Sequence, residues 1–172
     1  MKARMPSRPA RLPSAAAATL GVPAGEKVIA WGSTPDGDEV SFVVATNRAL
    51  YSEALGGRTP WSRISKATWE EPALSVTVLD DAGRPRRPLR LRIEESNDLP
   101  AAVYDRVTAS VVVSERVELR PGAKALLVAR TGSDSGEISW TVVFDAGLDP
   151  RDPELRRAAD SALSDLRGSL GI

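Results

Sequence analysis

The sequence has no cysteine and no histidine among its 172 residues. Without cysteine, the chain can form no disulfide, thiolate nucleophile or cysteine-ligated zinc site. Without histidine, it also lacks the commonest metal ligand and general base of proteins. Catalysis would have to use carboxylates, lysine, tyrosine or a serine–lysine pair, and no spacing singles out such a set. We therefore expect a protein that is not an enzyme and that needs no metal or other cofactor.

Excess charge and long apolar runs are also missing. Lysine and arginine number 23, aspartate and glutamate also number 23, and the formal net charge is +0. A domain that binds duplex nucleic acid usually has a basic excess, so we do not expect nucleic acid as a partner. No apolar run reaches the roughly 18–20 residues that span a bilayer. The alanine-rich run 15–20 is short for a secretory signal, which favours the cytoplasm.

Short β-type runs fill the middle of the chain, and glycine, proline, asparagine or aspartate separates each run from the next. This rhythm is typical of an antiparallel meander. Its clearest unit is the hairpin of 74–79 and 89–93, because apolar and polar residues alternate along both runs. We expect one domain over residues 26–116. Its seven strands are predicted at 26–32, 39–46, 49–54, 58–61, 64–70, 74–79 and 89–93.

A helix is predicted after the seventh strand, over residues 99–114. Asn97 or Asp98 can cap its start. The β-branched run 111–113 leaves the position of its last turn open. The apolar residues that recur at helical spacing are Leu99, Val103, Val107 and Val111.

The two ends of the chain have different compositions. Residues 1–13 form a basic, proline-rich arm whose composition predicts disorder. Residues 14–25 are predicted to form a short helix and a turn. Residues 117–172 are predicted to form a β-hairpin and helix extension, with the helix at 153–166. Because so few elements bury little apolar surface alone, we expect this extension to pack on the same domain.

Two short motifs occupy the third and fourth strands of the meander. One is a Thr-x-Arg-x-Leu-Tyr entry and the other a Pro-Trp-x-x-Ile step; their residues are Thr46, Arg48, Leu50, Tyr51, Pro60, Trp61 and Ile64. In these motifs and in its element order, the region of about residues 26–115 resembles a bacterial pleckstrin-homology-like domain. The whole chain also resembles uncharacterised actinobacterial proteins with this layout. The resemblance implies a mainly β fold, a seven-stranded antiparallel meander capped by a helix, and a protein that binds rather than reacts.

The distribution of charged residues argues against phosphoinositide binding, which is a familiar function of such domains. Members that bind phosphoinositides resemble one another in a basic first hairpin loop. Here the loop 33–39 carries Asp36, Asp38 and Glu39 without lysine or arginine, so an anionic head group would meet like charge. A basic cluster lies instead around the sixth and seventh strands. It can be a solvated, partly ion-paired face or a contact for an anion or acidic partner, and its residues are Arg84, Arg86, Arg87, Arg90 and Arg92.

Three functions remain open at this point. The first is a noncatalytic interaction or scaffold module, whose partner is a protein or a second copy held in a groove or on an exposed strand edge. The second is a peripheral protein that binds anionic lipids through the arginine hairpin and the N-terminal arm. The third is an enzyme of unknown type. The tryptophans favour core or interface positions over a base-stacking platform, and they are Trp31, Trp61, Trp69 and Trp140.

Overall fold

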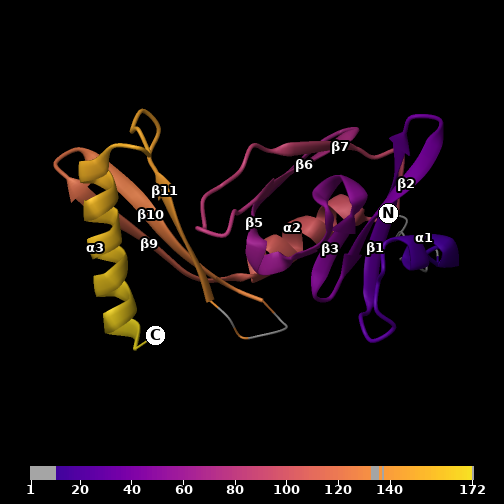
Figure 1. Cartoon of the computed structure of the whole chain (residues 1–172), viewed down its shortest axis with the longest axis horizontal. Helices are drawn as coiled ribbons and strands as arrows, with labels where there is room; N and C mark the ends of the chain where they lie inside the picture. Colours follow the sequence, from indigo (N-terminus) through magenta and orange to yellow (C-terminus); the bar gives the residue numbers. More distant parts are fainter. Residues whose placement is uncertain (1–10, 133–135, 137, 172) are drawn as a thin grey trace, which may run out of the picture.

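The computed structural model describes residues 11–132, 136 and 138–171. Most of the arm predicted at residues 1–13 therefore lies outside the described residues. The described chain is mainly β and forms two lobes joined end to end, with the helices α1 (Ser14–Thr19) and α3 (Pro153–Leu170) at opposite ends of the molecule (Figure 1). We call residues 11–109 the first lobe and residues 111–171 the second lobe.

The first lobe begins with a five-stranded sheet. It contains β1 (Val28–Asp36), β2 (Glu39–Thr46), β3 (Ala49–Ser52), β4 (Gly57–Pro60) and β8 (Glu95–Ser96). The strands lie in the order β4-β3-β2-β1-β8. Gly37 turns β1 into β2 with a φ of +61°, in the left-handed region that favours glycine. Pairing continues from Ser33 to Asp36, so the loop predicted at 33–39 is shorter than the sequence pattern indicates.

The first lobe continues with a three-stranded sheet. It contains β5 (Ile64–Glu70), β6 (Ala73–Val78) and β7 (Leu89–Arg92), in that order. The predicted pairing of 74–79 with 89–93 is confirmed, since β6 and β7 pair antiparallel with Leu74 opposite Leu91. The seven predicted strands thus correspond to β1 to β7, with bounds shifted by short 3₁₀ turns. These turns are η1 (Glu53–Leu55) and η2 (Trp61–Arg63).

The chain passes from the second sheet to the first at the end of β7. The amide of Ile93 donates to the carbonyl of Pro72 at 2.7 Å, and the next amide, of Glu94, donates to the carbonyl of Ser33 at 3.0 Å. The first part of the segment 89–96 therefore forms backbone hydrogen bonds with β6 and the residue before it. The last part forms backbone hydrogen bonds with β1. The two sheets share a corner, as sheets do when one strand bends between them.

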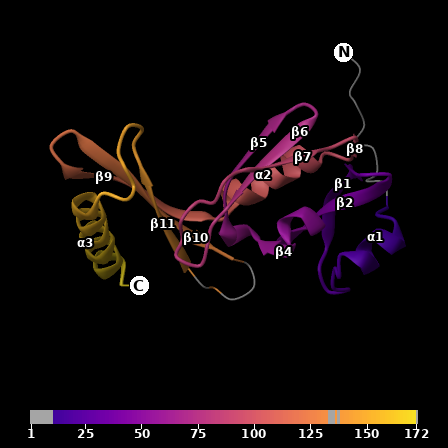
Figure 2. The ribbon, with the colours of Figure 1, turned by 45° about the horizontal axis from the view of Figure 1, so that its top comes forward.

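Helix α2 (Leu99–Ala109) fills the space between these two sheets (Figure 2). The predicted apolar stripe of the helix is confirmed for Leu99, Val103 and Val107, which are buried with Trp61 and Ile64 in one core. Burial of side chains of this size stabilises a fold by about 1.5–3 kcal/mol each. The helix begins with the hydroxyl of Ser96 as acceptor for the Leu99 amide at 3.0 Å. The side chains of Asn97 and Asp98, predicted as caps, do not cap it.

The predicted end of this helix at residue 114 is wrong. The helix ends at Ala109, and Val111 begins strand β9 (Val111–Arg120). The run 111–113 is β-branched, which disfavours a helix, and β10 (Ala123–Thr131) is available to pair with it. The domain boundary predicted between residues 116 and 117 consequently lies inside β9.

The outer face of the first sheet is also covered. Along β2, Val43 and Ala45 face the main core, whereas Phe42 and Val44 face a smaller cluster that includes residues before β1. The sequence pattern assigns one apolar face to Val40, Phe42 and Val44, yet Val40 is exposed. The strand is apolar on both faces because the segment around α1 packs on the outer one.

The second lobe is a three-stranded antiparallel meander covered by α3. Its strands are β9, β10 and β11 (Ile138–Phe144), with β10 in the centre. Asp152 caps the start of α3, since its side chain accepts the Glu154 amide at 2.9 Å. Leu155 and Ala159 are buried against the sheet. The helix runs past the predicted end at 166 and stops at Gly171, whose φ is +72°.

A buried arginine joins the two lobes. Arg130 of β10 is 7% exposed, and its guanidinium donates to the carbonyl of Val107 and the hydroxyl of Ser110, each at 3.1 Å, and to the carbonyl of Ser65 at 2.8 Å. No carboxylate among the described residues pairs with it. Burial lowers the pKa of this guanidinium from its ordinary value. The joint therefore depends on hydrogen bonds from a cation to neutral acceptors.

Candidate functional site

The first lobe has an apolar groove between β5 and the N-terminal half of α2, which we name the β5–α2 groove. It is a cavity of about 680 Å³. Two of its aromatic side chains are unusually open, Trp69 at 40% and Tyr104 at 62% exposure. The groove is lined by Ala67, Thr68, Trp69, Leu74, Asp98, Pro100, Ala101, Tyr104 and Asp105.

The position of Trp69 follows from the register of β5. Trp69 lies opposite Leu74 on β6, and cross-strand partners share a face of the sheet. Leu74 is 1% exposed in the main core, so Trp69 stands on the same core face. However, β5 is the edge strand of its sheet, and its tryptophan consequently lies at the rim of the core, where α2 leaves it partly open.

The polar groups of the groove are acidic. Asp98 and Asp105 line it, and no lysine or arginine does. The structure gives neither carboxylate an ion-pair partner within the described ranges. An incoming group that is apolar and carries a positive charge would therefore meet a complementary surface.

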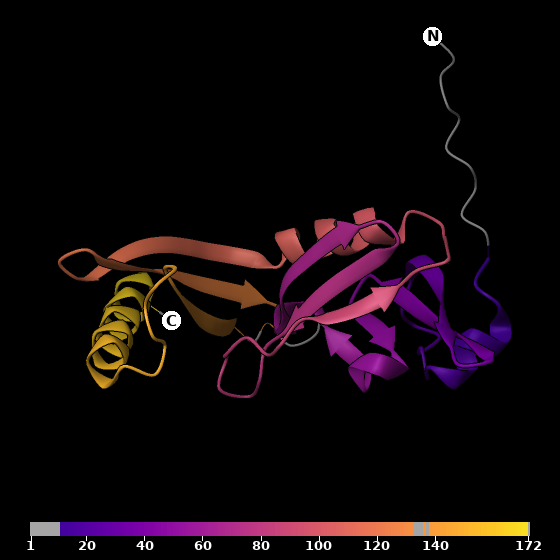
Figure 3. The ribbon, with the colours of Figure 1, turned by 90° about the horizontal axis from the view of Figure 1, so that it is seen from above.

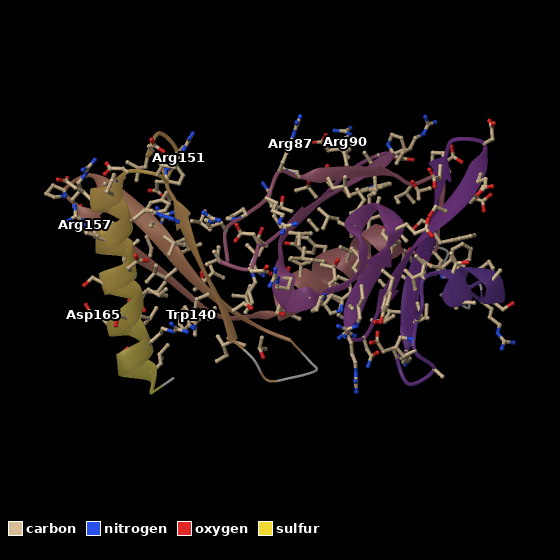
Figure 4. All side chains as sticks on the ribbon, viewed as in Figure 1. Arg87, Arg90, Trp140, Arg151, Arg157 and Asp165 are labelled. Atoms are coloured by element: carbon tan, nitrogen blue, oxygen red, sulfur yellow. The ribbon has the colours of Figure 1, made fainter. Side chains whose placement is uncertain are left out.

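The arginine cluster predicted from the sequence is mostly ion-paired. Arg84 lies 2.9 Å from Asp80, Arg90 lies 3.7 Å from Glu70 and Arg92 lies 3.9 Å from Glu94. Arg86 and Arg87 belong to the loop 79–88 between β6 and β7, and Arg87 and Arg90 point outward from the same side of the lobe (Figure 4). The five arginines do not converge on the β5–α2 groove. They form a solvated face whose positive charge is partly neutralised.

Backbone hydrogen bonds and one carboxylate hold the loop 79–88, and the carboxylate gives a pH prediction. Asp80 accepts hydrogen bonds from the amides of Ala82 and Arg84 and from Nε of Arg84, each at 2.9 Å. The Arg84 amide is the main cause that lowers the pKa of Asp80 below its usual 3.8. Because the pKa is lowered, the stabilisation from these hydrogen bonds is present at neutral pH and is lost as the pH falls through the folded-state value.

We expect the Asp80 carboxyl carbon to titrate in NMR below pH 3.8, and the Ala82 and Arg84 amides to exchange faster over the same pH range. Asp80→Ala removes the acceptor, so it should show fast exchange at neutral pH and lose the dependence. Amides that stay protected in Asp80→Ala would contradict this account of the loop.

The residues that carry the family resemblance hold the hairpins together. The hydroxyl of Thr46 accepts the Arg48 amide at 3.1 Å, and Nε1 of Trp61 donates to the Thr46 carbonyl at 3.1 Å. The hydroxyl of Tyr51 accepts from Nε of Arg58 at 3.1 Å. These residues line no part of the β5–α2 groove. The motif residues described here therefore stabilise the hairpins and contribute nothing to the lining of this groove.

The described residues contain no group of three His, Cys, Asp or Glu side chains placed to hold a metal ion. None of the helices in the described ranges is both long and apolar enough to cross a membrane. No family model, curated protein or solved structure matches the chain. The function must therefore be inferred from the geometry of its own surfaces.

Sequence reasoning identified one half of the aromatic pair. Trp69 is among the tryptophans expected at core or interface positions. Tyr104 was missed. It directly follows the buried Val103 and therefore lies outside the apolar stripe of α2. A large aromatic residue on the open side of a helix is the signal that would have identified it.

Proposed function

We propose that the chain is a noncatalytic interaction module with a pleckstrin-homology-like first lobe, and that its β5–α2 groove binds a segment of another protein. The observation that carries the proposal is the pair Trp69 and Tyr104, both exposed and both lining the same groove. Aromatic side chains dominate the energetics of protein interfaces, because each removes a large apolar area from water while keeping a polar edge.

The groove also indicates the chemistry of the segment. Its floor includes Ala67 and Leu74, so an apolar side chain can enter beside the two aromatic rings. Asp98 and Asp105 favour a lysine or arginine next to that side chain. A volume of about 680 Å³ suits a few side chains and falls in the range of small-ligand sites. The occupant is therefore a short apolar segment with a basic neighbour.

The alternative function, binding to anionic lipids, has less support. Three of the five arginines in the predicted cluster have carboxylate partners, which reduces the attraction to a negative surface. Arg86 and Arg87 are the two cluster members without an ion pair among the described residues. Salt-sensitive sedimentation with phosphatidylserine vesicles, abolished by Arg86→Ala together with Arg87→Ala, would support the lipid function instead.

The proposal is tested by selecting a phage-displayed random peptide library on the full chain. We expect peptides with an apolar residue beside lysine or arginine. Trp69→Ala should weaken the best peptide about 30-fold, the equivalent of a hot-spot loss of about 2 kcal/mol. Tyr104→Phe keeps the ring and should change the affinity less than about threefold, since it alters only a rim hydroxyl.

Isothermal titration calorimetry measures both affinities, and thermal unfolding confirms that each variant is folded. Peptides that bind Trp69→Ala as tightly as the unchanged chain would contradict the proposed groove. Selected peptides that carry acidic rather than basic residues would contradict the role of Asp98 and Asp105.

A further inference from the structure

A second groove lies in the second lobe, and we name it the β11 groove. It is a cavity of about 520 Å³ bounded by β11, by α3 and by the loop 79–88. Figure 3 shows this loop reaching from the first lobe towards the second. Trp140 of β11 lies beside α3 (Figure 4), with the guanidinium of Arg167 at 5.7 Å from its ring. The groove is lined by apolar side chains of Trp140, Val142, Val143, Phe144, Leu148 and Leu163.

One side of β11 has no strand partner. β11 is the edge of its sheet, and the Asp145 amide donates to the Lys124 carbonyl of β10 at 3.0 Å. In an antiparallel ladder, alternate residues turn their N–H and C=O groups towards the partner strand. Val143 is therefore bonded to β10, whereas the N–H and C=O groups of Val142 and Phe144 point away from it. No strand in the described part of the chain pairs with them.

The first lobe approaches this edge at one point. Gly83, with a φ of +73°, packs so closely that a Cβ there would clash with the carbonyl oxygen of Trp140. The contact agrees with the alternation, because Trp140 is two residues before Val142 and its carbonyl also points outward. The loop thus covers the start of the edge and leaves the stretch from Val142 to Phe144 for another chain.

The groove carries the opposite charge to the β5–α2 groove. Arg84, Arg151 and Arg156 line it, with Asp160 as the only carboxylate among its lining residues. Arg84 and Arg151 have acidic neighbours at 2.9 and 3.8 Å, and Arg156 has no ion pair among the described residues. An acidic ligand would gain a charge partner here without displacing an existing one at Arg156.

We propose that β11 accepts an extended acidic segment of another protein as an additional strand of the third sheet. Its backbone would pair with Val142 and Phe144, its alternate apolar side chains would enter the groove, and its carboxylates would meet Arg156. Residues 1–10 of this chain are an unsuitable occupant, since they contain Lys2, Arg4 and Arg8 and no carboxylate. A second copy paired edge to edge would bring its own arginines against these. The site goes beyond the proposed function, because it uses other residues and a partner of opposite charge.

The test combines peptide selection with amide hydrogen exchange on the full chain. A phage-displayed random library of 12-residue peptides is selected in the presence of excess peptide for the β5–α2 groove, so that the first groove is filled. We expect enriched peptides with alternating apolar residues next to aspartate or glutamate. A synthetic copy should slow exchange of the Val142 and Phe144 amides about tenfold or more, and leave Val143, already bonded to β10, unchanged.

Two variants separate the contacts. Arg156→Glu should weaken the acidic peptide about tenfold, and replacing the peptide's carboxylates with lysine should restore binding to this variant. Val142→Pro removes the outward N–H, which an edge strand tolerates, and keeps an apolar side chain at the groove; it should abolish peptide binding while near-ultraviolet circular dichroism stays unchanged. Trp69→Ala should not change the affinity for this peptide, so the result distinguishes binding at the β11 groove from binding at the β5–α2 groove.

The proposal is overturned if the selection yields no peptide that depends on Arg156, or if bound peptides leave the Val142 and Phe144 amides exchanging freely. Protection of these amides that rises with the concentration of the chain alone, with a dimer in light scattering, would assign the edge to a second copy and likewise overturn the acidic partner.

Discussion

Gly32→Val is expected to destabilise the chain by about 3 kcal/mol, because overpacking a filled core commonly costs that much. Gly32 sits where β1, β8 and α2 meet. A Cβ there would lie 2.9 Å from the carbonyl oxygen of Glu95, 2.9 Å from Cγ2 of Ile93 and 3.0 Å from Cδ2 of Leu99. The carbonyl belongs to the β1–β8 pairing and cannot retreat without breaking the corner between the two sheets. The midpoint of thermal unfolding should fall by roughly 6–12 °C for a chain of this size.

Gly25→Val is the matched control for this prediction. A Cβ at Gly25 meets no atom within 4 Å, so we expect a change in unfolding free energy within about 0.5 kcal/mol, as at ordinary surface positions. Urea unfolding of both variants measures the difference. Equal midpoints for the two variants would show that the corner is not closely packed at Gly32.

Arg130→Ala is expected to cost about 3 kcal/mol, because a long buried side chain and its hydrogen bonds are removed together. The carbonyls of Val107 and Ser65, which the guanidinium bonds at 3.1 and 2.8 Å, lose their partner. The change should also loosen the joint, so that amides of β9 and β10 next to α2 exchange faster than those at the far end of the second lobe.

Arg116→Ala is the matched control on the same sheet. Arg116 is an exposed arginine that pairs with Asp145 at 2.9 Å, and exposed pairs contribute only about 0–1 kcal/mol. Arg130→Met separates packing from hydrogen bonding, since it fills most of the volume without donors. If Met at residue 130 restores full stability, the hydrogen bonds of Arg130 add nothing to the joint.

The structure could be predicted from the sequence where the local hydrophobic pattern agrees with the tertiary contacts. The hairpin of β6 and β7 could be predicted because residues alternate along both strands, and each apolar residue finds the core on one side only. The same holds for Leu99, Val103 and Val107, whose helical spacing fits a single buried stripe. Trp61 was expected at a core or interface position, and it is buried in the main core.

Prediction failed where contact with a segment far away in the sequence determines the local structure. Val111 continues the stripe of α2 by spacing, but pairing with Arg130 of β10 makes it a strand residue. Phe42 and Val44 face outward in the sheet and are covered by residues near α1, which a local pattern does not reveal. The β5–α2 groove also depends on tertiary structure, because Trp69 is partly exposed where β5 forms the edge of its sheet.

The two lobes are connected without a linker. Ser110 alone separates α2 from β9, and its carbonyl accepts the Thr131 amide from the end of β10 at 2.9 Å. Adding residues there would rotate β9 relative to α2 and move Arg130 away from its acceptors. Exchange of the second lobe for an unrelated one would remove Arg130 and the hydrogen bond between Ser110 and Thr131, so the two lobes cannot be swapped independently.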